Sequence, residues 1–449
     1  MPRKAISDEK QRSRQHWAWY MYDFGNSAYA AVVLLAVYAT YFKNQVVGGA
    51  DGSRLWGLAI GSAILVVEIL SPILGAMADF AASKKRLLFI FSAISWVFTA
   101  LLFFVQKGDV LMGFVFFVLA EIGYRGGQVF YNSLLPEIAT SDEMGQVSGS
   151  GWAIGSIGGV VCLLFILPPI FLTKNNPALN LLVVRGTFIF AALFFATCAS
   201  LVFLRVKETR KGRTLPSGET YFSIAIKRLV ETFRAVRHFR QFMTFIVAFL
   251  IYNEGILMAL DFAAIIGAVL FGMNQTQLIL FMILVQVTSA LGAYLFGLMA
   301  EKTGFKKALI VSLVLMIAAV VWMVFNPSLT GYYIIGGLAG FALTGVQSLS
   351  RTMTGLFAPE SKSAEFFGFF AMAGQSLAFV GPITFGVLTA WLAGYFQSSG
   401  LDSLHAEQDG TRAALLVIVL FLVAGLVTLL SVNEKRARQA AEEYAPAAD

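Results

Sequence analysis

Four polar side chains follow one face of an otherwise apolar segment: Glu121, Arg125, Gln128 and Asn132. Their spacing of 4, 3 and 4 residues places them on one stripe of an α-helix. Glu121 and Arg125 are oppositely charged neighbours at i and i+4. A charge near the centre of a bilayer costs about 2.5–3.5 kcal/mol even on the most lenient scale. The stripe is therefore either a neutral structural pair that faces a helix bundle, or a lining that binds a polar solute or passes a proton.

A second stripe of this kind carries Thr344, Gln347 and Arg351. A guanidinium stays protonated, so an arginine is poorly suited to carry protons. It can instead grip a carboxylate or a phosphate with two hydrogen bonds. We therefore expect Arg125 and Arg351 to hold an anionic group of a substrate.

Carboxylates are the titratable groups that lie inside the apolar segments, because all three histidines fall outside them. Proton coupling would therefore use carboxylates whose pKa is shifted by desolvation or by an arginine. We expect Glu121, Glu254 and Asp261 to serve in coupling, whereas a structural role is expected for Glu68. Asp23, Glu254 or Asp261 would bind an amine or a proton. Neutral hydrogen bonds to the substrate are expected from Asn26, Gln128, Asn132, Asn253 and Gln347.

The composition excludes most other classes of protein. Of 449 residues, 58% are hydrophobic and 13% charged, and the mean hydropathy is +0.74, which is typical of a membrane protein. Two cysteines, Cys162 and Cys198, are too few for a disulfide framework or a metal site. There is no nucleophile–base pair, Gly-rich phosphate loop or nucleotide-binding domain. We expect no enzymatic activity and no cofactor.

Runs of about 20 apolar residues can cross a bilayer as helices. The sequence contains roughly twelve such runs, six on each side of a polar linker. They predict an all-α membrane protein of twelve transmembrane helices in two pseudo-symmetric six-helix bundles. The expected spans are 17–42, 55–79, 86–106, 110–135, 145–172, 182–205, 241–270, 276–300, 306–326, 330–357, 366–395 and 412–432.

Lysine and arginine set the expected orientation. About 25 of the 33 fall in segments that are cytoplasmic if both termini are cytoplasmic. Membrane topology thus explains the net charge of +7, and we expect no nucleic-acid partner. The expected location is the cell (inner) membrane. The expected domains are an N-terminal bundle, 1–206, a cytoplasmic linker, 207–240, and a C-terminal bundle, 241–449.

The linker has apolar residues at helical spacing over 219–240, including Phe222, Ile226 and Phe233, with basic residues largely off that stripe. This pattern predicts an amphipathic helix on the inner membrane surface. The helix is either a regulatory lipid sensor or a solvated connector between the two bundles.

A short motif occurs twice, with Gly297 placed 222 residues after Gly75. Each copy ends one apolar run and leads into the next through basic residues. Two related halves are what a transporter of the rocking type requires. The motif predicts a cytoplasmic latch that gates transport. Its residues are Gly75, Asp79, Lys84 and Arg86 in the first copy, and Gly297, Glu301, Gly304 and Lys306 in the second.

These repeats resemble the loop 2–3 signature of the major facilitator superfamily. The second copy fits it well, whereas the first has Phe80 in place of a basic residue and Ala82 in place of glycine. Arg125 and Gln128 are similar to the fourth-helix motif of the same superfamily. The resemblance implies the major facilitator fold, with a central cavity between the two bundles.

A narrower resemblance, to the vacuolar effluxer-like (autophagy-related) permease family, covers most of the chain. Five ordered motifs carry it: Tyr22 to Tyr29, Asn132 to Glu137, Tyr252 to Gly255, Gly345 to Arg351 and Ala364 to Phe369. The usual seventh-helix motif is Asn-Asp-Gly, and Glu254 here keeps its charge. The resemblance implies efflux of amino acids.

We therefore expect secondary transport of a small polar or zwitterionic solute by alternating access, with proton coupling as a further expectation. The alternatives are a lipid or lysolipid translocase, in which the arginines hold a phosphate, and a non-transporting membrane receptor or scaffold. The expected partners are the solute and membrane lipids, and the expected state is a monomer.

Overall fold

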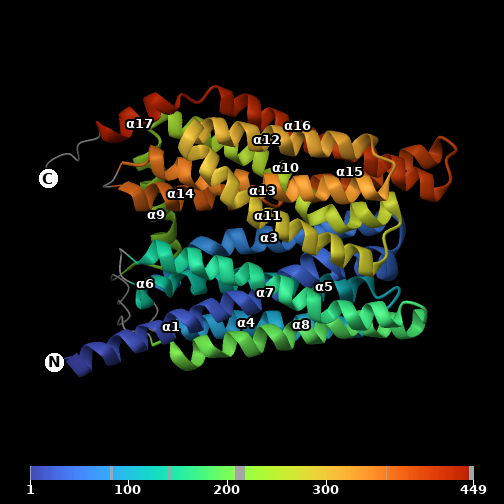
Figure 1. The fold of residues 1–449 in the computed structure, drawn as a ribbon, viewed down its shortest axis with the longest axis horizontal. Coiled ribbons are helices and arrows are strands. Elements are labelled where there is room, and N and C mark those ends of the chain that lie inside the picture. The colour runs from blue at the N-terminus through green and yellow to red at the C-terminus, as the bar shows by residue number, and fades with distance from the viewer. Residues whose placement is uncertain (1, 81–83, 140–142, 208–217, 360–361, 444–449) are drawn as a thin grey trace. The chain divides into compact units, whose positions relative to one another are not determined.

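The computed structural model describes residues 2–80, 84–139, 143–207, 218–359 and 362–443 (Figure 1). The regular elements of these residues are all helices. In the first half they are α1 (Pro2–Tyr29), η1 (Ala30–Ala36), α2 (Tyr38–Tyr41), η2 (Phe42–Val47), α3 (Gly49–Phe80), α4 (Lys84–Leu101), η3 (Leu102–Phe104), α5 (Val110–Ser133), α6 (Leu135–Ile138), α7 (Met144–Thr173) and α8 (Pro177–Arg205). They continue as α9 (Tyr221–Val236), α10 (Arg240–Phe271), α11 (Gln275–Thr303), α12 (Phe305–Phe325), α13 (Leu329–Phe357), α14 (Ser363–Ser376), α15 (Val380–Ser398), α16 (Ser403–Leu430) and α17 (Glu434–Glu442).

Twelve stretches of the described chain are long and apolar enough to cross a membrane, which confirms the predicted number of spans. The last of them begins at Ser403, earlier than the sequence suggested, because Asp402 accepts hydrogen bonds from the backbone N–H groups of Leu404 and His405. Arg412, where the last expected span began, therefore lies within α16. Its guanidinium donates to the carbonyls of Val324 and Asn326.

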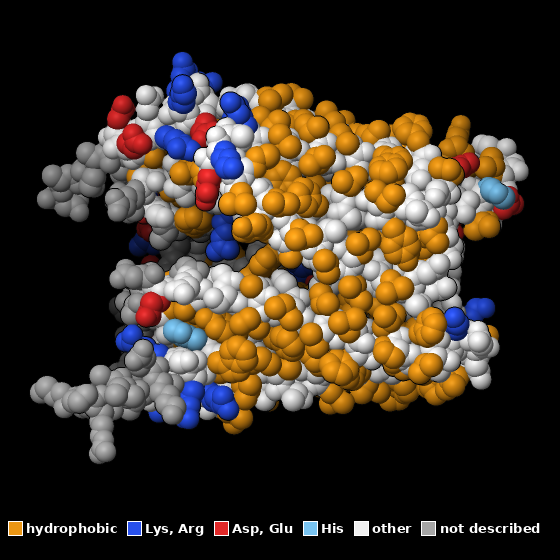
Figure 2. All heavy atoms as spheres, in the orientation of Figure 1, with side chains coloured by type: hydrophobic (Ala, Val, Ile, Leu, Met, Phe, Trp, Pro, Cys, Tyr) orange, Lys and Arg blue, Asp and Glu red, His pale blue; other side chains and the backbone are white. Residues whose placement is uncertain are grey.

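The surface of the described residues fits a lipid environment. On the face shown in Figure 2, hydrophobic side chains cover the middle of the helices, whereas charged side chains gather near the helix ends. Leu111 and Leu172, for example, are 77% and 78% exposed. Large apolar side chains this exposed would be costly in water and are ordinary against acyl chains.

The helices pack into two compact units. The first consists of residues 1–48, 62–226 and 274–279, and the second of 49–61, 227–273 and 280–449. Three helices, α3, α9 and α11, therefore contribute to both units. That residues 1–206 and 241–449 move as two rigid bundles stays a prediction.

In the first unit, α1 packs along α7 and α8, and α4 packs along α5 and α8 (Figure 1). Glycines of α7 allow close approach of its backbone to α1. A Cβ atom at Gly158 would lie 2.1 Å from the carbonyl oxygen of Phe24, and one at Gly151 would lie 2.3 Å from the ring of Trp19. The backbones of α1 and α7 can meet only because no side chain stands between them.

In the second unit, α10 packs against α15 and α16, and α12 packs against α13 and α16 (Figure 1). The first part of α3 joins this unit through close contacts with α10 and α15. The indole N–H of Trp56 donates to the carbonyl of Asp261 at 3.1 Å. A Cβ at Gly57 would lie 2.2 Å from the carbonyl oxygen of Pro382.

The predicted linker helix is present as α9. Ile224 and Ala225 on one face are buried and pack with Ala76 of α3. Of the predicted apolar stripe, Phe222 is 61% and Phe233 46% exposed. The helix therefore packs on α3 through Ile224 and Ala225, and part of the predicted stripe is uncovered.

Candidate substrate and coupling site

A short ion pair inside a span of the first unit joins Glu121 and Arg125, both on α5. The guanidinium Nε donates to Glu121 Oε1 at 2.5 Å. The Glu121 side chain is fully buried, whereas 31% of the Arg125 side chain is exposed. The helical spacing of the two residues brings them together, as the sequence predicted. The pair fixes the guanidinium in place, and its exposed part remains reachable.

Glu68 of α3, for which the sequence predicted a structural role, also interacts electrostatically with Arg125. The carboxylates of Glu68 and Glu121 therefore both attract the same guanidinium. The Glu68 oxygen Oε1 is buried without a hydrogen-bond partner among the described residues. The signal in the sequence was its position inside an apolar span, where an acidic residue needs a partner or a role.

Asp23 and Asn26 lie together on α1. The Asn26 amide donates to Asp23 Oδ1 at 3.5 Å, and only 2% of Asn26 is exposed. The other oxygen of Asp23 sits against α7, where a Cβ at Gly155 would lie 2.4 Å from it. A partly buried carboxylate thus rests on a glycine of the neighbouring helix.

Gln128 and Asn132 continue the stripe on α5 towards its C-terminal end. Gln128 is partly buried and Asn132 is exposed. The nearby aromatic residues fasten α1 to α5: Trp19 and Tyr131 stack at 4.4 Å and each donates to the other's backbone carbonyl. The stripe therefore runs from the half-buried Glu121–Arg125 pair to the exposed amide of Asn132.

In the second unit, Asn253 of α10 connects two other helices. Its Oδ1 accepts from Gln347 Nε2 of α13 at 3.2 Å, and its Nδ2 donates to the carbonyl of Gly374 of α14 at 3.4 Å. Arg351 lies one turn after Gln347 and is exposed. The predicted Asn253 and Gln347 are thus in direct contact. Among the described residues, Arg351 does not belong to this group of hydrogen bonds.

Glu254 and Asp261 are both buried on α10, at 3% and 7% exposure. Glu254 Oε2 accepts a 2.7 Å hydrogen bond from the backbone N–H of Gly381, near the start of α15. Asp261 lies two turns further along the helix, where its backbone carbonyl receives the indole of Trp56. The two predicted coupling residues therefore have different surroundings.

The first helix of each half carries a tyrosine that is hydrogen-bonded to a serine of another helix. Tyr22 of α1 shares a 2.8 Å hydrogen bond with Ser92 of α4. Tyr252 of α10 shares one of 2.6 Å with Ser350 of α13. Each tyrosine directly precedes a predicted site residue, Asp23 or Asn253, and so helps to fix its rotation about the helix axis.

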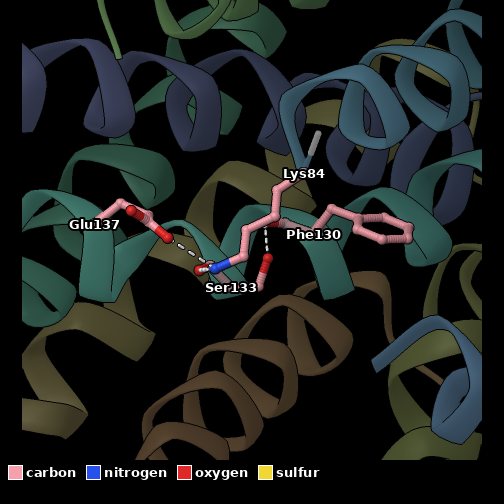
Figure 3. A network of polar contacts seen from close by, with 4 residues as sticks. All are labelled: Lys84, Phe130, Ser133 and Glu137. Atoms are coloured by element: carbon pink, nitrogen blue, oxygen red, sulfur yellow. Dashed lines mark hydrogen bonds and ion pairs between the residues drawn. The ribbon is translucent and has the colours of Figure 1, made fainter. Parts of the chain in front are cut away.

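The basic residues of the first latch copy are held within the first unit. Lys84 Nζ lies 2.9 Å from Glu137 Oε1 and donates to the carbonyl of Ser133 at 3.2 Å (Figure 3). Lys85 donates to the carbonyl of Val206 at the end of α8, and Arg86 is exposed. Glu137, which sequence analysis quoted within a motif without a role, is thus the partner of Lys84.

In the second latch copy, a lysine likewise binds the end of the last membrane helix of its half, α16. Lys306 donates to the carbonyls of Leu430 and Val432, where α16 ends, at 2.9 and 2.6 Å. Glu301 is exposed, and Gly304 has a positive φ of 96° where α11 turns into α12. Asp79 lies in α3, but its side chain is outside the described residues. A Cβ at Gly75 or Gly297 would meet no atom within 4 Å, so neither glycine is a packing contact here.

The comparisons with known proteins agree with this architecture. The model of the family described as Vacuole effluxer Atg22 like matches residues 58–442. The uncharacterized MFS-type transporter YxiO of Bacillus subtilis (strain 168) is 26% identical over 97% of this chain and 98% of its own. Autophagy-related protein 22 of Kluyveromyces lactis is 20% identical over 81% of this chain and 75% of its own.

Solved structures share the fold at low sequence identity. A bacterial homologue of the human lysosomal transporter Spinster, in an inward-facing and unoccupied conformation, superposes with a TM-score of 0.74 and 18% identity, covering 97% of this chain and 99% of that one. The nucleoside transporter NupG superposes with a TM-score of 0.63 and 12% identity, covering 97% of this chain and 100% of that one. The chain therefore belongs to the Vacuole effluxer Atg22 like family and is a multi-pass membrane transporter of the major facilitator type, not an enzyme.

Proposed function

We propose that this transporter is a secondary active exporter of a small polar or zwitterionic solute, with an amino acid as the first substrate to test. The observation that carries the proposal is the Glu121–Arg125 pair. The carboxylate is fully buried, while the guanidinium is held at 2.5 Å and stays 31% exposed. An arginine oriented in this way is suited to a carboxylate on a solute, because its donors form a planar fork.

The same unit also carries negative charge for a cationic group. Glu68 and Glu121 both act on Arg125, so the three residues together have an excess carboxylate. Asp23 adds another on α1. A zwitterion presents both a carboxylate and an ammonium, and this arrangement of charges supports such a ligand over a simple anion.

The relatives support export and a polar cargo without identifying either. The matching family is described as a vacuole effluxer, and one structural neighbour is titled a nucleoside transporter. Alternating access would move the predicted bundles 1–206 and 241–449 against each other, with both termini and the linker in the cytoplasm and the protein acting as a monomer. The two latch copies would bias the states of this cycle.

Proton coupling would use Glu121, Glu254 or Asp261, which are buried acidic residues within the spans. Glu254→Gln or Asp261→Asn should then abolish transport driven by a pH gradient. Counterflow exchange, which needs no net proton movement, should persist. If each of the three carboxylates can be neutralised singly with pH-gradient drive intact, the coupling ion is not the proton.

The deciding experiment is counterflow in proteoliposomes with radiolabelled amino acids, a radiolabelled nucleoside and a fluorescent lysolipid in parallel. We expect an amino acid to exchange, and Arg125→Gln to abolish the exchange. Arg54→Gln is the matched control, because Arg54 forms a surface pair with Asp51 and is 48% exposed. Arg125-dependent movement of the lysolipid alone would replace this proposal with lipid translocation.

A further inference from the structure

The eleventh span is interrupted along its length. Together α14 and α15 form one span, Glu365–Ser398, yet the helix stops at Ser376 and restarts at Val380. At such a break the last carbonyls of one helix and the first N–H groups of the next lose their helical partners. Each unsatisfied group costs several kcal/mol in a bilayer, so other groups must replace the lost hydrogen bonds.

Two consecutive residues of α10 supply a partner on each side of the break. Asn253 Nδ2 donates to the carbonyl of Gly374 near the end of α14, and Glu254 Oε2 accepts from the N–H of Gly381 at the start of α15. Both side chains are buried, at 6% and 3% exposure. Gln347 holds the Asn253 amide from the opposite side. Because one peptide bond joins the two residues, they fix the ends of the two helices relative to each other.

The glycine at the start of α15 is part of this arrangement. A Cβ at Gly381 would lie 2.9 Å from Glu254 Oε2 and 3.0 Å from the Glu254 carbonyl oxygen. A side chain there would separate the helices. Pro382 follows directly and has no N–H to satisfy, which suits the first turn of a helix. The carboxylate also lies at the positive end of the α15 dipole, where a negative charge is favoured.

In the first half of the chain, a carboxylate also lies against a glycine of a neighbouring helix, but that helix is not interrupted. Asp23, which follows Tyr22 as Asn253 follows Tyr252, rests on Gly155 of α7. That helix is continuous from Met144 to Thr173. A carboxylate against a glycine is therefore common to both halves, but only the second half uses it to bridge a helix break.

We propose that Asn253 and Glu254 are positioning residues that clamp the α14–α15 break and thereby set the angle between the two half-helices during transport. This inference rests on the proposed transport function but assigns Glu254 a mechanical role that does not depend on the coupling ion. The role requires an acceptor oxygen at Glu254, not a negative charge. Glutamine should therefore replace it, and leucine should not.

The test is a distance measured across the break. Spin labels at Gly368 on α14 and Tyr395 on α15 occupy exposed positions, and the 27 residue steps from one to the other correspond to roughly 40 Å of helix. Pulsed electron resonance in proteoliposomes should give one narrow distribution in the parent protein and in Glu254→Gln. Glu254→Leu and Gly381→Ala should broaden or shift it. Gly394→Ala is the control, because a Cβ there meets no atom within 4 Å.

Counterflow of the solute gives the second readout. Loss of a hydrogen bond to a charged group should slow exchange about tenfold or more in Glu254→Leu and Gly381→Ala, while Glu254→Gln exchanges normally. Should Glu254→Leu fail to fold, Gly381→Ala and Asn253→Leu provide the same comparison. An unchanged distance distribution in the clamp variants, or equal effects of glutamine and leucine, overturns the clamp.

The outcomes also separate the clamp from the transport proposal. If no solute exchanges but the distances change as described, the clamp stands and the substrate class is wrong. If Glu254→Gln loses only pH-gradient drive, with its distances unchanged, both coupling and clamp are supported.

Discussion

The ammonium of Lys84 and the carboxylate of Glu137 lie 2.9 Å apart between the start of α4 and the short helix α6 (Figure 3). Only 12% of the Lys84 side chain and 1% of the Glu137 side chain are exposed. Lys84, which the sequence assigned to a gating latch, therefore has a structural partner within the first unit.

Removing one member of this pair should destabilise the protein. A buried charge left without its partner costs about 3–5 kcal/mol. We expect Lys84→Met and Glu137→Gln each to lower the thermal unfolding midpoint in detergent, and the double variant to be less affected than the sum of both. Arg86→Met, at an exposed neighbouring position, is the control. Strictly additive effects would mean that the two groups do not interact.

The glycines of α7 give a matched test of helix packing. Gly158→Ala should destabilise the protein by about 1–3 kcal/mol, since its Cβ would lie 2.1 Å from the Phe24 carbonyl oxygen. Gly149→Ala on the same helix meets no atom within 4 Å and should stabilise by up to about 1 kcal/mol through helix propensity. The thermal unfolding midpoints of both variants, compared with that of the parent protein, test these two expectations. Equal destabilisation would contradict the packing of α1 on α7.

Lys306 should protect the end of α16. Its two hydrogen bonds to the carbonyls of Leu430 and Val432 are made by a charged donor. Lys306→Met should therefore raise amide hydrogen exchange around residues 428–436. The exposed neighbour Lys307 provides the control Lys307→Met, which should leave exchange unchanged. If both variants exchange alike, the capping role is wrong.

The latch prediction concerns conformational populations. A partly exposed acidic group near a helix end contributes about 0.3–1 kcal/mol, or about 2 when partly buried. We predict that Glu301→Gln shifts the protein towards an inward-open state more than Asp79→Asn does. Spin-label distances between the ends of α3 and α14, and of α11 and α7, would report the shift. Unchanged distances in both variants would leave the motifs as topology signals.

Topology can be tested by labelling. In a cysteine-free background, single cysteines at Ser217, which lies outside the described residues, and at Ser403 should react from opposite sides of the membrane. Labelling of both from outside would exclude the predicted orientation.

The class of fold and most of the polar residues within the spans could be predicted from local sequence patterns. Apolar runs of membrane length, basic flanks and a repeated motif can be read without tertiary contacts, because bilayer thickness and helical periodicity impose them. The pairing of Glu121 with Arg125 followed from its i,i+4 spacing alone. The break in span 11 has a local cause as well, since Gly374, Gly381 and Pro382 weaken a continuous helix.

The hydrogen-bond and ion-pair partners of those polar groups depend on how the helices pack in three dimensions. Lys84 binds Glu137, 53 residues away, and Glu254 binds Gly381, 127 residues away. Nothing local specifies such partners, because they depend on which helices become neighbours and how each is rotated about its axis. The same holds for Glu68, whose position beside Arg125 is set by the packing of α3 and not by its own segment. Periodicity gives the face of a helix, and only packing determines what that face contacts.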